Sequence, residues 1–286
     1  MSAHSLTRRA TGRRRWMLHL GLMAGAFCMV YPLLWMVGSS FKPDNQIFTQ
    51  LSPIPDSLDT MNYKSGWTLG TGISFTTFYV NSFIVCAGAI MGNLMSCSLA
   101  AYAFARIRFR GRKLLFGVML GTLMLPIHVI IVPQYIIFHS LRWTNTFLPL
   151  IVPKFFAVDA FFIFLMVQFI RGIPVELEEA AMIDGCGRFG MFTKIILPLI
   201  KPALVTTTIF TFIWTWNDFL SQLLYLNTQD RYTISLGLRQ FLDASGASAW
   251  GPMFAMTTLS LVPVIVVFLF FQKRLVEGIA TTGLKG

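Results

Sequence analysis

The sequence predicts an all-α membrane protein with six transmembrane helices. Of its 286 residues, 55% are hydrophobic and only 12% are charged, whereas a soluble domain carries roughly a quarter charged residues. A surface so poor in charge must face lipid or other apolar protein. The basic residues form short clusters between long apolar runs and do not line one solvated face. This pattern argues against nucleic-acid binding, although the formal net charge is +11.

Six apolar segments are long enough to cross a hydrocarbon core about 30 Å thick, which takes about 20 helical residues. They cover residues 17–38, 75–104, 114–138, 145–170, 202–226 and 251–271. The first is too long for a typical signal core and no cleavage site follows it, so we expect a retained span. Prolines interrupt the third span (Pro126, Pro133) and the fourth (Pro149, Pro153). We expect kinks there, with the freed carbonyls satisfied inside protein or along a wet cavity.

The distribution of lysine and arginine predicts the orientation. The N-terminal arm, the loops 105–113 and 171–201 and the C-terminal tail hold 17 of the 23 basic residues. The opposite side holds five, and Lys154 lies within a span. Cytoplasmic segments carry the excess of positive charge, so both termini are expected in the cytoplasm. The expected organisation is a basic arm (1–16), a six-span domain (17–272) with an external loop (39–74) and a cytoplasmic loop (171–201), and a tail (273–286).

The cytoplasmic loop 171–201 predicts a short capped helix of about ten residues. Pro174 suits a first helical turn, and the glutamates within 176–179 place negative charge at the positive end of the helix. Ala180 and Ala181 favour the helix and would let another surface approach its backbone. Gly185 suits the left-handed position that ends a helix. An amphipathic connector resting on the membrane surface would show the same features.

The spacing within this loop favours a helix that docks to another protein over a connector that rests on the membrane surface. Glu179-Ala180-Ala181 is followed by Gly185 after three residues, by Ile195 after nine more, and then by Leu197-Pro198. These seven identities resemble the EAA loop of ATP-binding-cassette (ABC) importer permeases at every specified position. In that family the loop forms coupling helices that sit in a cleft of the ATPase subunit. The resemblance implies an ATPase-coupling role for Glu179, Ala180, Ala181, Asp184, Gly185, Ile195, Leu197 and Pro198.

The resemblance covers nearly the whole chain and is strongest to the carbohydrate-importer branch, with the ABC type I importer fold. The segments that carry it are Ser40–Pro43, Asn62-Tyr63, Asn81-Ser82, Ala100–Arg106, Leu125-Pro126 with Pro133 and Tyr135, Trp216–Phe219 and Gly283–Gly286. It implies a subunit of the bacterial cytoplasmic (inner) membrane that imports sugars or oligosaccharides. An acidic oligosaccharide or glycerol phosphate is the alternative substrate.

The implied partners are a second permease in a heterodimer, two copies of an ATPase subunit and an extracytoplasmic solute-binding protein. The chain has no G-x-x-x-x-G-K-[ST] phosphate loop, so ATP and Mg are expected on the ATPase and no cofactor, metal or catalytic residue on this chain. A secondary transporter should show charged relays or an inverted repeat. A membrane enzyme should show a metal cluster or an activated nucleophile. Neither pattern is evident.

Four polar residues within the predicted spans are candidates for a translocation cavity: Lys154, Asp159, Asn217 and Asp218. Lys154 and Asp159 stand about 140° apart around a helix, which predicts that they do not pair with each other. Each lines the cavity or is structural. Asn217 and Asp218, near Trp214 and Trp216, would suit a sugar. The preferred interpretation is an interfacial aromatic belt with a polar clamp between helices, the partner permease making most substrate contacts.

Overall fold

The computed structural model describes residues 4–56, 58–68, 72–242 and 249–283, and all regular structure within these ranges is helical. The chain divides into two compact units. One comprises residues 1–72 and 240–260, and the other comprises residues 73–239 and 261–286. Both contain long apolar helices, as the composition predicts.

The first unit contains the N-terminal helix and the expected external loop. Its helices are α1 (His4–Ser39), α2 (Asp44–Ile47), α3 (Met61–Thr68), most of η4 (Arg239–Phe241) and the start of α15 (Trp250–Gly283). Lys42 is fully buried in the loop, and its Nζ donates to the carbonyls of Gln50 (2.8 Å) and Ser52 (2.5 Å). The amide of Asn62 donates to the carbonyl of Lys42 at 2.8 Å. The loop is therefore folded on itself.

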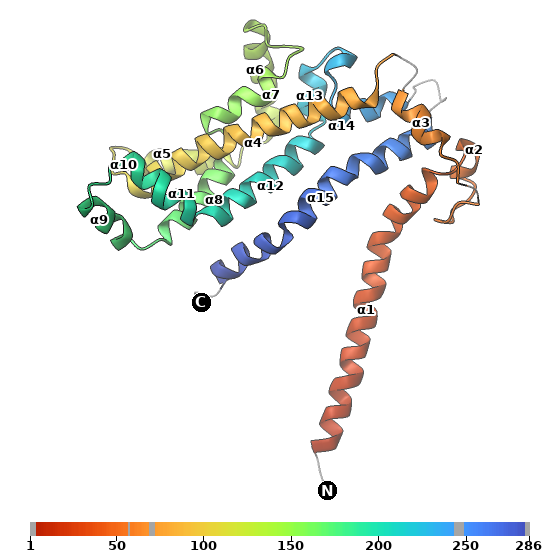
Figure 1. Ribbon diagram of the computed structural model, residues 1–286, viewed down its shortest axis with the longest axis horizontal. Helices are drawn as coiled ribbons and strands as arrows, with labels where there is room; N and C mark the ends of the chain where they lie inside the picture. The colour runs from red at the N-terminus through yellow and green to blue at the C-terminus, as the bar shows by residue number, and fades with distance from the viewer. Residues whose placement is uncertain (1–3, 57, 69–71, 243–248, 284–286) are drawn as a thin grey trace. The chain divides into compact units, whose positions relative to one another are not determined.

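The second unit is built around α4 (Phe75–Arg106), which runs through its centre (Figure 1). The helices packed against α4 are α7 (Leu148–Ile151), η1 (Val152–Phe156), α8 (Ala160–Arg171), α12 (Lys201–Asn217), α14 (Ile234–Leu238) and η3 (Gln229–Arg231). This unit also contains α5 (Arg112–Thr122), α6 (Ile127–Ser140) and α13 (Leu220–Tyr225), besides the helices of the 171–201 loop and the later part of α15. Buried apolar side chains of α4, α8 and α12 form its core, among them Ala101, Phe162 and Ala203. Small residues along α4 permit this close packing: a Cβ on Gly92 would lie 2.9 Å from the backbone of Lys154.

Four helical segments are long and apolar enough to cross a membrane, and there are up to six if each of two bent helix pairs counts as one span. The four are Trp16–Ser39, Phe75–Arg106, Leu148–Arg171 and Trp250–Gln272. The expected third span is the first bent pair, in which α5 and α6 meet at 101° just before Pro126. The predicted kink at Pro126 is therefore confirmed. Pro133 lies inside α6 without ending it.

The prediction of a fifth span over residues 202–226 is wrong about where the helix ends. α12 ends at Asn217 because Asp218 adopts an extended backbone (φ −66°, ψ 113°). Its carboxylate Oδ1 then accepts the backbone N–H of Ser221 at 3.1 Å at the start of α13. The expected fourth span is interrupted as well: Ala157 is left-handed (φ 54°) between η1 and α8.

The loop expected on the cytoplasmic side, residues 171–201, forms α9 (Glu176–Ile183), α10 (Arg188–Met191), the π-helical η2 (Phe192–Ile196) and α11 (Leu197–Leu199). The predicted helix is thus eight residues long, and Pro174 lies two residues before it instead of in its first turn. Gly185 has the predicted left-handed backbone (φ 77°). Helix α9 ends in a complete Schellman motif: the N–H of Cys186 donates to Ala181 at 2.9 Å, and that of Gly185 to Met182 at 3.0 Å.

Candidate functional site

The loop of residues 171–201, named the coupling loop after the role that its EAA resemblance implies, presents α9 to solvent. Glu179, Ala180, Asp184 and Gly185 are exposed, and Ala181 is half-buried. Large apolar side chains beside them are exposed too, with Ile183 at 86% and Phe189 at 75%. Exposed apolar side chains next to a flat stretch of small residues are typical of a protein contact surface. Beyond the turn, Ile195 and Leu197 are half-buried and Pro198 is exposed.

One ion pair attaches α9 to the central helix. The Arg106 Nε donates to a carboxylate oxygen of Glu178, and its Nη2 donates to the carbonyl of Ile173 at 2.7 Å. Only 12% of the Arg106 side chain and 9% of the Glu178 side chain are exposed. Charge-assisted bonds shielded from water are the stronger ones. The coupling loop is therefore held to the C-terminal end of α4.

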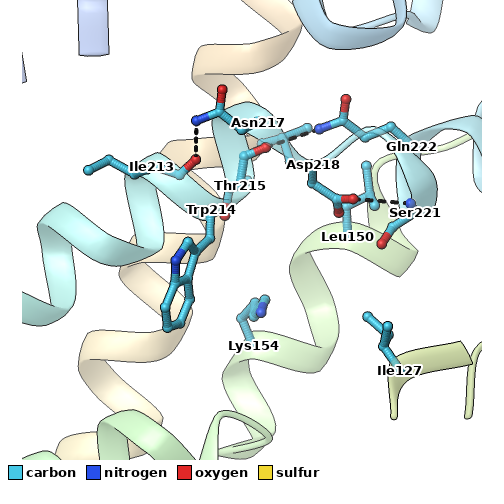
Figure 2. Close-up of a pocket in the computed structure, with 11 residues that line it drawn as sticks. Ile127, Leu150, Lys154, Ile213, Trp214, Thr215, Asn217, Asp218, Ser221 and Gln222 are labelled. Carbon is cyan, nitrogen blue, oxygen red and sulfur yellow. Dashed lines mark hydrogen bonds between the residues drawn. The ribbon is translucent and has the colours of Figure 1, made fainter. Parts of the chain in front are cut away.

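Two adjoining cavities in the second unit hold most of the polar residues predicted for a pathway. They measure about 370 Å³ and 280 Å³, in or near the range of roughly 300–1,000 Å³ for ligand pockets. Lys154, Asp218 and Ser221 line both of them, together with Ile127 and Leu150. Figure 2 shows Lys154 of η1 beside the Trp214 ring, with Asp218 above them at the end of α12.

Lys154 and Asp159 form an ion pair, contrary to the prediction from helical spacing. The Lys154 Nζ lies 2.8 Å from Asp159 Oδ2, with 29% and 24% of the two side chains exposed. The angle of about 140° assumed a continuous α-helix. The chain between them is a 3₁₀ turn followed by the left-handed Ala157, which brings the two charges together. The prediction failed because the helix is broken between them.

A buried asparagine connects this pair to two other helices. The Asn93 amide of α4 is fully buried and donates to Asp159 Oδ2 at 2.6 Å and to the Thr211 hydroxyl of α12 at 3.1 Å. The Ser96 hydroxyl donates to the carbonyl of Lys154 at 2.6 Å. The carbonyl of Lys154 thus finds a partner inside protein. The network joins α4, α8 and α12 beside the cavities.

The residues at the end of α12 differ in the polar groups and aromatic surface that they expose to the cavity. The Asn217 amide turns back along its own helix and donates to the carbonyl of Ile213 at 2.8 Å (Figure 2). Asp218 Oδ1 accepts the backbone N–H of Ser221, and its other carboxylate oxygen accepts no hydrogen bond from the described residues. Half of the Trp214 side chain is exposed at the cavity wall. Trp216 is buried among aromatic rings of α4, including Phe83 at 5.1 Å.

Sequence reasoning missed several residues of these sites. Glu178 was noted only as helix-end charge, and nothing in the linear pattern links it to Arg106, 72 positions away. Gln222 and Tyr225 were assigned to the interior of a span, whereas they line the cavities. Asn93 carried a usable signal, because a fully polar amide in an apolar segment needs a hydrogen-bond partner.

The comparison with protein families decides the identity of the chain. Residues 85–281 match the family described as "Binding-protein-dependent transport system inner membrane component". The chain belongs to this family. The match includes the coupling loop, both cavities and every polar residue of the network, so these features lie within the family's domain. The chain is accordingly a multi-pass inner membrane protein of an ABC transporter system.

Relatives and a solved structure agree with this assignment. The chain is 37% identical to "Probable ABC transporter permease protein YurM" of Bacillus subtilis (strain 168), covering 96% of this chain and 91% of that one. It is 32% identical to "Arabinooligosaccharides transport system permease protein AraQ" of Halalkalibacterium halodurans, covering 95% and 96%. A bacterial ABC transporter "involved in the import of the acidic polysaccharide alginate" shares the fold, with a TM-score of 0.79, 24% identity and coverage of 96% and 98%.

Proposed function

We propose that this chain is one of two permease subunits of an ATP-driven importer for a sugar or oligosaccharide. It forms half of the translocation pathway, and a second permease forms the other half. Family membership over residues 85–281 carries the proposal. The name of the AraQ relative supports a carbohydrate substrate. An acidic oligosaccharide remains the second candidate, because Lys154 lines both cavities and the structural relative imports alginate.

In the proposed assembly, α9 docks into an ATPase subunit on the cytoplasmic side, where both termini also lie. The exposed Ala180 allows close approach of a partner's surface, and Ile183 supplies apolar area at the tip. The ATPase dimer binds ATP and Mg, and an external solute-binding protein delivers the solute. The concentration of basic residues in the arm, the 105–113 loop, the coupling loop and the tail supports this orientation.

The route by which docking would move the pathway runs along α4. Arg106 holds Glu178 of α9 at one end of this helix, and Val85 lines a cavity nearer the other end. The helix is continuous from Val85 to Arg106, and these 21 steps span about 32 Å at 1.5 Å per residue. Displacement of α9 by the ATPase would thus pull on the cavity through one rigid element.

A pair of matched glycine variants tests the docking. Gly185 and Gly111 both have left-handed backbones (φ 77° and 82°), are exposed, and have nothing within 4 Å of a built Cβ. Gly185→Arg and Gly111→Arg therefore impose the same backbone strain, of order 1–3 kcal/mol, in two loops expected on the same side. We expect Gly185→Arg to reduce co-purification of the ATPase by tenfold or more, on the order of 1.4 kcal/mol of binding, while Gly111→Arg retains it.

The comparison of the two variants makes the result interpretable. Equal loss of the ATPase from both would show a general effect of the charge or the strain, and full retention in Gly185→Arg would refute docking through α9. Membrane insertion and Tm of each variant are measured first, so that a folding defect is recognised as such.

A further inference from the structure

The charges on the cavity wall separate the two substrate classes that the proposed function leaves open. We define the cavity wall as Lys154, Asp159, Trp214, Asp218, Ser221 and Tyr225, all of which line one or both cavities. Among the residues that line them, only three carry a formal charge: Lys154, Asp159 and Asp218. Lys154 alone would favour an anionic solute such as an acidic oligosaccharide.

The ion pair cancels that preference. The Lys154 Nζ is 2.8 Å from Asp159 Oδ2, and Asn93 holds the same carboxylate oxygen in place at 2.6 Å. An anionic solute would have to compete with a counter-ion that is already fixed by a fully buried amide. To a solute in the cavity, the pair is close to neutral.

Asp218 then determines the sign of the net charge on the cavity wall. Its carboxylate accepts the backbone N–H of Ser221 at 3.1 Å. Within the described residues no cation forms an ion pair with it. The three formal charges therefore add to one excess negative charge, in a space walled by Ile127, Leu150 and other apolar groups. A negatively charged solute is therefore disfavoured in this cavity.

A second observation points to a hydrogen-bonding ligand. Tyr225 lines the smaller cavity and is only 3% exposed, yet its hydroxyl has no hydrogen-bond partner within the described part of the chain. A buried hydroxyl without a partner costs on the order of 1–3 kcal/mol, so its retention calls for a compensating contact. The exposed half of Trp214 offers an aromatic face at the same wall.

We propose that this wall is a subsite for a neutral, hydroxyl-rich solute and that it disfavours acidic ones. Asp218 accepts from solute hydroxyls, Tyr225 donates to a solute oxygen, and Trp214 packs on the apolar face of a sugar ring. The inference rests on the proposed function, since it assigns a substrate class to the pathway of that importer. It distinguishes this chain from its structural relative, which imports an acidic polysaccharide.

Charged thiol reagents test the sign of the wall without knowledge of the solute. Ser221→Cys is made in a chain lacking the accessible cysteines (Cys28→Ser, Cys186→Ser), and the complete transporter is treated with a cationic trimethylammonium or an anionic sulfonate methanethiosulfonate. The cation-to-anion rate ratio is normalised to Thr49→Cys, an exposed site in the external loop. We expect a normalised ratio of roughly ten, as for one unit charge acting on two reagents of opposite sign.

The added change Asp218→Asn should return the ratio to about one, because asparagine keeps the acceptor for Ser221 but removes the charge. A ratio below one, no response to Asp218→Asn, or no reaction with either reagent would each overturn the inference. Co-purification of the ATPase is measured on the same samples. Its loss from the Ser221→Cys complex would count against the proposed function and not against the sign of the wall.

Tyr225→Phe gives an independent measurement. If the hydroxyl serves a solute, its removal should leave the Tm of the complex unchanged or higher, because an unpaired buried group is removed. A clear decrease in Tm would show that the hydroxyl has a structural partner, and the Tyr225 contact would be rejected.

Discussion

Gly185 and Ala157 are two of the left-handed residues in the described part of the chain, and their conformations are specified in different ways. Gly185 ends α9 with φ 77°, and Ala157 ends η1 with φ 54°. At Gly185 the residue type itself permits the conformation, and two backbone hydrogen bonds complete the Schellman motif. At Ala157 the residue type opposes it by about 1 kcal/mol. The second break must be held by its surroundings.

Tertiary contacts around Ala157 hold the left-handed backbone that the residue type does not favour. Asp159, two residues on, stands at the N-cap position of α8 but makes no capping bond. Its carboxylate instead accepts from Lys154 and Asn93, and Ala157 packs against the core of the second unit. A local stop signal is thus sufficient at the exposed coupling loop, whereas the cavity wall depends on side chains distant in sequence.

The largest effect that follows is expected for Asp159→Ala. The change leaves Lys154 and the buried Asn93 amide without their shared acceptor, at a cost of about 2 kcal/mol, below that of a fully buried pair because both charged groups are one-quarter exposed. The Tm of the purified complex should fall accordingly. Asp230→Ala removes an exposed ion pair with Arg231 and should change stability by less than about 0.5 kcal/mol. Equal Tm values for the two variants would contradict the view that the contacts of Asp159 stabilise the helix break at Ala157.

A smaller and strictly local effect is expected for Gly185→Ala. Alanine must adopt the left-handed conformation at a cost of about 1 kcal/mol, which should accelerate hydrogen exchange of the α9 amides about fivefold. Gly187→Ala is the matched control, since Gly187 is exposed and has φ −72°. Faster exchange in the control as well, or in α4, would mean that the turn is not an independent unit.

The smallest effect is expected for Ala157→Gly. Glycine relieves the left-handed strain of about 1 kcal/mol but adds freedom to the unfolded chain worth about 0.4–1 kcal/mol. Stability should stay within about 0.5 kcal/mol of the native value, measured as Tm. Ala103→Gly, inside the regular helix α4, should cost about 1 kcal/mol by the same measurement. A similar loss at both positions would show that Ala157 is not strained.

The same distinction explains which parts of the fold could be predicted. Helix existence in the apolar segments, the kink at Pro126 and the turn at Gly185 follow from hydropathy, ring geometry and glycine freedom, which act within a few residues. The end of α12 at Asn217 did not follow, because the run 202–226 is apolar on both sides of Asp218. The pairing of Arg106 with Glu178 and of Lys154 with Asp159 was equally invisible.

For this protein the sequence alone determined the membrane class, the family and the presence of a short helix that ends at Gly185, because each depends on composition or on short-range spacing. The tertiary structure decided the arrangement of the cavity wall. The charges of Lys154, Asp159 and Asp218 are present in the sequence, but their net effect on a solute depends on which of them neutralise one another. That depends on distances between segments, and these are set only when α4, α8 and α12 pack.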